Sequence, residues 1–206
     1  MDGFTGFKTA AAEELPDAVA VMDPFHVIRL AGEAVDLCRR RIQLQLHGHR
    51  GRSGDPLYSC RRTLHTGAGL LTDRQAERIV ALFDDERHAA VGATWGIDQR
   101  MIGAYRHPDR ALGKAAMQAV IDALHAGIPE GLDELRRLGR TLRQRADDVL
   151  AFFDRPGTSN GPTEAINGRL EHLRGSALGF RNLTNYIARS LLETGGFRPQ
   201  LHPGMR

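Results

Sequence analysis

The chain has 206 residues, 41% of them hydrophobic, with 28 lysines and arginines against 25 aspartates and glutamates. This length and apolar content are ordinary for a globular protein and argue against disorder throughout the chain. No stretch approaches the ~18 apolar residues of a membrane-spanning helix, and the N-terminus lacks a signal-peptide pattern. Cys38 and Cys60 show no metal-ligand spacing, which fits a reducing compartment. We therefore expect a cytoplasmic protein without a membrane partner.

The positive charge is concentrated at the C-terminal end. Residues 155–206 contain seven arginines against the three acids Glu164, Glu171 and Glu193, whereas the preceding residues are close to neutral. A basic end on a neutral body favours a polyanionic partner, although such a bias is common in proteins without one.

The N-terminal residues suggest a helix followed by a strand. An alanine-rich run ends at Leu15, and the short apolar run at residues 18–22 has the length of a strand and is closed by Asp23 and Pro24. A helix followed by a continuous apolar strand is typical of a parallel sheet covered by helices. The predicted fold class is therefore α/β, although most of the chain is helical.

The centre of the chain, residues 31–155, has apolar residues at helical spacing throughout. Thr72 and Gln75 form a capping-box pattern that opens one of these helices. The helix pair over residues 72–105 could be a DNA-reading helix-turn-helix, but its second helix is not basic, which argues against that reading. The predicted helices cover residues 25–46, 72 onward, 89–105, 112–124 and 132–153.

A further helix is predicted to begin between residues 159 and 161. Its polar face carries Asn160, Glu164, Asn167, Glu171 and Arg174 at a spacing of three to four residues. A solvated amphipathic helix and a helix facing a site both explain this pattern. A last helix is predicted over residues 183–192, followed by a loose end over residues 195–206.

Three acids and one histidine are candidates for chemistry. Asp2 would end a strand lying before it, and Asp23 and His26 follow the predicted strand, while Glu164 lies on the late helix. Such carboxylates suit Mg²⁺ or Mn²⁺, and two-metal sites of this kind cleave phosphodiesters. The competing interpretation is structural, because an Asp before Pro is often a helix cap and a lone His is more often part of a core.

Two groups of motifs in this chain resemble a known family. The first is Asp2-Gly-Phe-Thr-Gly-Phe, followed by Met22-Asp23-Pro24-Phe25-His26-Val27. The second is Ser159-Asn160-x-x-x-Glu164-x-x-Asn167, followed by Gly179-Phe180-Arg181-Asn182. In this order and separation they are similar to the DDE transposases of bacterial insertion sequences, of the ISL3-like group.

The resemblance implies an incomplete ribonuclease-H-like DDE core with a large helical insertion. The core would include a remnant over residues 1–30 and closing helices over residues 156–194, with the insertion at 31–155 and a flexible tail at 195–206. The implied activity is Mg²⁺-dependent cleavage and strand transfer at the ends of an insertion sequence. The implied partner is DNA, in a nucleoid-associated protein.

Site residues follow from the resemblance by position. Asp2 matches the second acid of the catalytic triad and Glu164 the third, so these two would hold the metal. Supporting roles fall to four further residues, Asp23, His26, Asn160 and Asn167. Basic positions suited to DNA phosphates are matched by Arg169, Arg174 and Arg181.

The family's first catalytic acid has no counterpart in this sequence. We therefore expect an N-terminally truncated transposase with little or no strand-transfer activity on its own. The alternative is a non-catalytic DNA-binding or oligomerising remnant, forming a homo-oligomer or binding a full-length transposase and modulating it.

Overall fold

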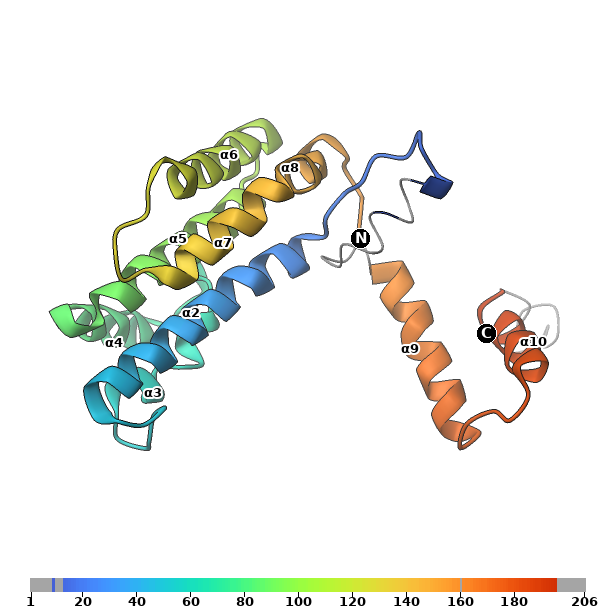
Figure 1. The fold of residues 1–206 in the computed structure, drawn as a ribbon, viewed down its shortest axis with the longest axis horizontal. Coiled ribbons are helices and arrows are strands. Elements are labelled where there is room, and N and C mark those ends of the chain that lie inside the picture. The colour runs from blue at the N-terminus through green and yellow to red at the C-terminus, as the bar shows by residue number, and fades with distance from the viewer. Residues whose placement is uncertain (1–8, 10–12, 160, 196–206) are drawn as a thin grey trace. The chain divides into compact units, whose positions relative to one another are not determined.

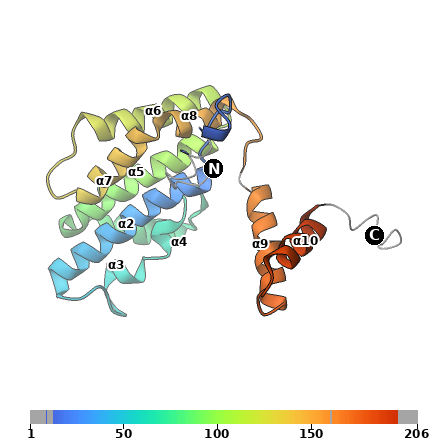
Figure 2. The ribbon, with the colours of Figure 1, turned by 45° about the vertical axis from the view of Figure 1, so that its right-hand side comes forward.

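The computed structural model describes residues 9, 13–159 and 161–195, and the chain divides into two compact units between Thr158 and Ser159. Unit 1 is a helical bundle in which α2, α5, α6 and α7 lie side by side (Figures 1 and 2). Three short 3-10 turns, at Thr63–His65, Ala68–Leu70 and Glu86–His88, join its smaller helices. The helices of unit 1 are α2 (Pro24–His47), α3 (Pro56–Ser59), α4 (Asp73–Phe83), α5 (Ala89–Arg106), α6 (Arg110–Ala126), α7 (Asp133–Gln144) and α8 (Ala146–Asp154). None of the described helices is long and apolar enough to span a membrane.

Local sequence signals set the ends of these helices as predicted. The long α2 begins at Pro24, whose missing N–H costs nothing in a first turn. It ends at Gly48, which has a φ of 70° and donates its N–H to the Leu44 carbonyl at 2.9 Å. At the start of α4, the Thr72 N–H donates to Gln75 Oε1 at 3.0 Å, as a capping box requires. The predicted helices over residues 25–46, from 72 and over 89–105 and 112–124 are thereby confirmed.

The strand predicted at residues 18–22 is wrong. Residues 18–23 form neither helix nor strand, and no strand occurs anywhere in the described part of the chain. The Met22 side chain is only 1% exposed, and its N–H donates to the Asp148 carbonyl at 2.9 Å. Val21 and Met22, at the end of the run, are buried, whereas Val19 is 54% exposed, so only the last part of the run packs against helices. The described fold is therefore mostly α, and the ribonuclease-H-like core stays a prediction.

The single helix predicted over residues 132–153 is also wrong, because it is broken into α7 and α8 at Arg145. This residue has a φ of −116° and a ψ of 17°, outside the helical region. Its guanidinium turns inward and donates from Nε to Asp148 Oδ2 at 2.5 Å, with both side chains at most 7% exposed. Removing one partner of a buried pair strands a charge in the core, which is strongly unfavourable. Each partner therefore depends on the other for its place at the bend.

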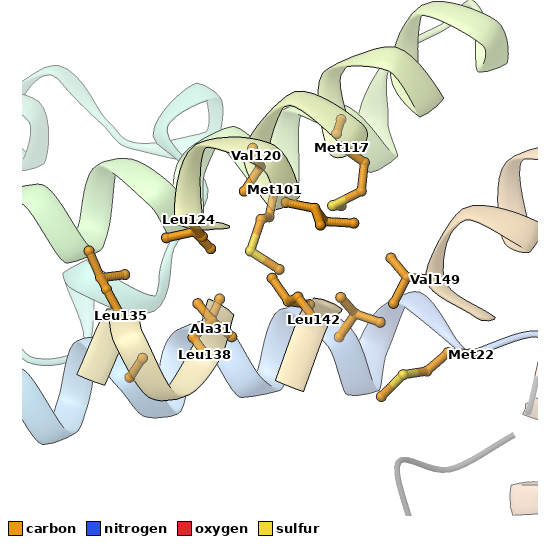
Figure 3. Close-up of a cluster of buried hydrophobic side chains, with 14 of the residues drawn as sticks. Met22, Ala31, Met101, Met117, Val120, Leu124, Leu135, Leu138, Leu142 and Val149 are labelled. Carbon is orange, nitrogen blue, oxygen red and sulfur yellow. The ribbon is translucent and has the colours of Figure 1, made fainter. Parts of the chain in front are cut away.

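Two hydrophobic clusters hold unit 1 together, and α2 and α5 contribute to both. In the first, Val27 and Ala31 of α2 and Met101 of α5 pack with α6, α7 and α8 (Figure 3). In the second, Val35 and Cys38 of α2 pack with Val91 of α5 and with the smaller helices. Further members of the first cluster are Met22, Met117, Val120, Leu124, Leu135, Leu138, Leu142, Val149 and Phe153. Further members of the second cluster are Leu57, Leu64, Ile79 and Leu82.

Unit 2 consists of α9 (Gly161–Ser176) and α10 (Leu183–Thr194), which confirm the two late helices in the predicted places. The two helices contact each other, but no described residue of either is fully buried. Between them, Gly179 has a φ of 91° and donates its N–H to the Arg174 carbonyl at 2.9 Å. Asn182 Oδ1 then accepts the N–H groups of Thr184 and Asn185, which caps α10.

The domain boundaries predicted from the resemblance stay a prediction. Most of the expected loose end, residues 196–206, lies outside the described residues.

Candidate functional site

Asp23 and His26 lie at the start of α2, and the structure shows what each contributes to the fold. Asp23 is the N-cap residue, and its Oδ1 accepts the Phe25 N–H at 2.8 Å. The His26 ring is 7% exposed and meets the Phe25 ring edge-on, with the ring centroids 5.5 Å apart. Both residues therefore have the structural role that competes with their predicted role in a site.

The Asp23 carboxylate lies near a buried tyrosine of α5. Burial raises the pKa of the Tyr105 phenol above its usual value, and the negative charge of Asp23 raises it further. The Tyr105 ring stacks on Phe153 with centroids 5.2 Å apart, and its buried hydroxyl has no hydrogen-bond partner among the described residues. The N-terminal end of α2 is thus joined to α5 and α8 by a mainly aromatic cluster.

Glu164 lies in the first turn of α9 and is exposed to solvent. Before it, Ser159 Oγ accepts the Gly161 N–H at 3.0 Å, which fixes the helix start. A carboxylate in a first turn is stabilised by the positive end of the helix dipole. The predicted polar face therefore exists as a helix face, with Asn167 exposed on it as well, and in the described structure this face is solvated.

The three predicted DNA-binding arginines also belong to unit 2 and are exposed. Arg174 Nη2 lies 2.8 Å from Glu171 Oε2, with side chains 61% and 66% exposed, so this pair contributes little to stability and holds the guanidinium loosely. Arg169 lies on α9, and Arg181 lies in the turn before α10.

The predicted site residues are divided between the two units, and two of them lie outside the described residues. Asp2 and Asn160 lie outside the described residues, Asp23 and His26 belong to unit 1, and Glu164 belongs to unit 2. Over residues 13–159 and 161–195, no group of three His, Cys, Asp or Glu side chains could hold a metal ion.

A buried carboxylate on α5 was not predicted from the sequence. Asp98 is 2% exposed, and its Oδ2 accepts a bond from Gln99 Nε2 at 3.0 Å. Gln99 Oε1 in turn accepts the Ala68 N–H at 2.5 Å, which ties the 3-10 turns to α5. Burial raises the pKa of Asp98 to about 6. The available signal was an aspartate on the apolar stripe of a helix, between Thr94 and Met101.

Comparison with known proteins identifies the class. A transposase family model, of the ISL3-like DDE type, matches residues 1–190. The chain is 29% identical over 222 aligned residues to the transposase for insertion sequence element IS1557 in two Mycobacterium tuberculosis strains. No solved structure matches the chain significantly.

The chain belongs to the ISL3-like DDE transposase family. The alignment covers 93% of this chain but 46% of each curated relative, so the chain spans about half of their length.

The cap role of Asp23 predicts a difference between two substitutions. Asp23→Asn retains an oxygen that accepts the Phe25 N–H, so the free energy of unfolding should change little. Asp23→Ala removes the cap and should lower it by roughly 1 kcal/mol. Urea unfolding of both variants measures this. Equal destabilisation by the Asn and Ala variants would show that Asp23 stabilises the fold through its charge and not through the hydrogen bond to Phe25 N–H.

Asp98 predicts a pH-dependent stability. An acid whose pKa is about 6 in the folded chain, against 3.8 ordinarily, holds its proton more tightly when folded. The contribution of Asp98 to the free energy of unfolding is therefore most favourable below about pH 4. It decreases as the pH rises to about 6 and stays low above that. Asp98→Asn should therefore stabilise the fold by roughly 1–3 kcal/mol near pH 7.5 and little near pH 4.

Urea unfolding at both pH values measures this effect. Asp17→Asn, at an exposed position, is the matched control and should show no such pH dependence. An equal effect of Asp98→Asn at both pH values would contradict the assignment.

Proposed function

We propose that this chain acts in DNA transposition, as part of the machinery that cleaves and joins DNA at insertion-sequence ends. The observation that carries the proposal is the family match over residues 1–190, supported by the similarity to the IS1557 transposases. Both motif groups that gave the resemblance, around Asp2 and Glu164, lie inside the matched range. DNA is the proposed partner, and Mg²⁺ or Mn²⁺ the proposed cofactor.

Within this proposal, Asp2 and Glu164 are the metal-binding acids. Glu164 is supported by its place at the start of α9, where it is accessible and near the positive end of the helix dipole. The exposed Arg169, Arg174 and Arg181 would contact phosphates from the same unit. For Asp23 and His26 we propose a supporting role, since a cap and a buried ring hold the start of α2 in place without contacting DNA.

A chimera tests the catalytic assignment. Residues 1–206 replace the aligned half of a full-length relative, and the transposition frequency of a marked element is measured. Glu164→Gln keeps the shape of the side chain but removes the charge that binds the metal, so transposition should fall to background. Glu171→Gln is the matched control, because Glu171 is exposed on the same helix and pairs with Arg174, and it should retain transposition.

The chimera distinguishes a catalytic role from a structural one. Equal loss with both variants would show that helix α9 needs its charges for folding or assembly. Activity of the Glu164→Gln chimera would remove this residue from the catalytic site.

A second candidate function is modulation of a full-length transposase. It is favoured by the two hydrophobic clusters of unit 1, which give this part of the chain a core of its own. In this role the polypeptide would bind DNA or a full-length transposase without itself performing strand transfer. Its expression beside an intact relative should then change the transposition frequency of a marked element, and an unchanged frequency would argue against modulation. Mg²⁺-dependent cleavage of an element end by this polypeptide alone would show that it is itself an active enzyme.

A further inference from the structure

The outward face of α7 is a row of arginines. Arg136, Arg137, Arg140 and Arg143 are exposed, whereas Leu135, Leu138 and Leu142, on the opposite side of the helix, are at most 4% exposed. With 3.6 residues per turn, the arginines at 136, 140 and 143 form one line, and Arg137 flanks it. We call these four residues the α7 arginine face.

The acids near this face are directed elsewhere. Glu134 forms a two-bond ion pair with Arg41 of α2, at 2.7 Å to Nε and 2.8 Å to Nη2, and this pair lowers the pKa of Glu134. Asp133 forms an ion pair with Arg136. From Leu135 to Ala146 the sequence contains no acid, and within the described structure Arg137 and Arg140 have no ion-pair partner.

Several other exposed basic residues of unit 1 have an acidic partner. Arg29 pairs with Glu33, Arg40 with Asp36, Arg87 with Asp85 and Lys114 with Asp154. On α7, by contrast, like charges stand three and four residues apart, which destabilises a helix. A bound polyanion would relieve this repulsion.

The α7 arginine face is also held rigidly. Gly139 packs so close to α6 that a Cβ there would lie 3.1 Å from Leu124 Cβ and 3.2 Å from its carbonyl oxygen. On the other side, the Arg41–Glu134 pair ties α7 to α2, and Arg41 also donates to the Gly131 carbonyl at 2.7 Å. At the far end, Arg143 Nη1 donates to His125 Nδ1 of α6 at 3.0 Å. Since the helix that carries the arginines is fixed in place, binding has to order only their side chains.

We propose that the α7 arginine face binds the sugar-phosphate backbone of duplex DNA, independently of base sequence. The inference rests on the proposed function for the identity of the polyanion, and it adds a DNA-contacting surface in unit 1. From Arg136 to Arg143 the face extends roughly 10 Å along the helix axis. This length covers about three phosphates of one strand, which advance about 3.4 Å each along the duplex. Guanidinium groups suit such contacts through paired N–H donors.

Salt-dependent binding to duplex DNA tests the inference. The 206-residue chain is titrated onto a fluorescent duplex of unrelated sequence, and anisotropy gives the affinity between about 50 and 200 mM salt. The double variant Arg137→Gln and Arg140→Gln removes two phosphate contacts. The slope of log K against log salt should then fall in magnitude by nearly 2, and binding should weaken roughly 10- to 100-fold at low salt.

The double variant Arg74→Gln and Arg78→Gln on α4 is the matched control. It makes the same change in net charge, also at exposed arginines of unit 1, but Asp73 and Glu77 lie beside these positions. Its slope should equal that of the unsubstituted chain. A slope reduced by the α4 variant and not by the α7 variant would overturn the inference and assign DNA binding to the helix pair over residues 72–105.

A charge-conserving variant separates charge from folding. Arg137→Lys with Arg140→Lys should keep the slope, whereas loss of binding there would mean that the substitutions disturb the fold and would overturn the inference. The inference would also be overturned by an unchanged slope in the Gln variant or by the absence of duplex binding by the unsubstituted chain. Because this assay uses unrelated DNA and no cleavage, its failure is distinguishable from failure of the proposed transposition chemistry in the chimera.

Discussion

The burial of α2 along its length is the constraint on which unit 1 depends. Val27 and Ala31 are removed from water in one cluster, and Val35 and Cys38, one to two turns later, in the other. Apolar burial is the dominant favourable term in folding, so neither cluster forms unless this helix is in place. The position of α7 follows from it, since Arg41 of α2 holds Glu134 and thereby leaves the arginines of α7 facing outward.

Several motif residues that suggest a transposase also have a structural role here. Asp23 caps α2, Gly179 ends α9 through its positive φ, and Asn182 caps α10. Glu164 and Arg181 have exposed side chains. Membership of the family is established by the match over residues 1–190, whereas the role of each of these residues is argued from its position and accessibility.

The distribution of charge is more informative than its total. A formal net charge of +3 on 206 residues says little about partners. In unit 1, the exposed residues Arg29, Arg40 and Arg87 each pair with an acid, and such surface pairs largely cancel. On α7 the carboxylate of Glu134 pairs with Arg41 of α2. Arg137 and Arg140 therefore have no ion-pair partner within the described structure. This local excess of positive charge would attract a polyanion, and it cannot be seen in the net charge of the chain.

The sequence alone predicted most of the helices and the family, because the 3–4 spacing, the capping box at Thr72 and the two end motifs are local signals. It failed at residues 18–22 and at Arg145. A short apolar run is compatible with a strand or with burial against helices, and only the packing of Met22 on α8 decides between them. At Arg145, an arginine three residues before an aspartate is equally compatible with a continuous exposed helix, and only the burial of the pair marks the bend. Charge partners such as Arg41 and Glu134 are 93 residues apart, so which arginines remain unpaired was decided only by the tertiary structure.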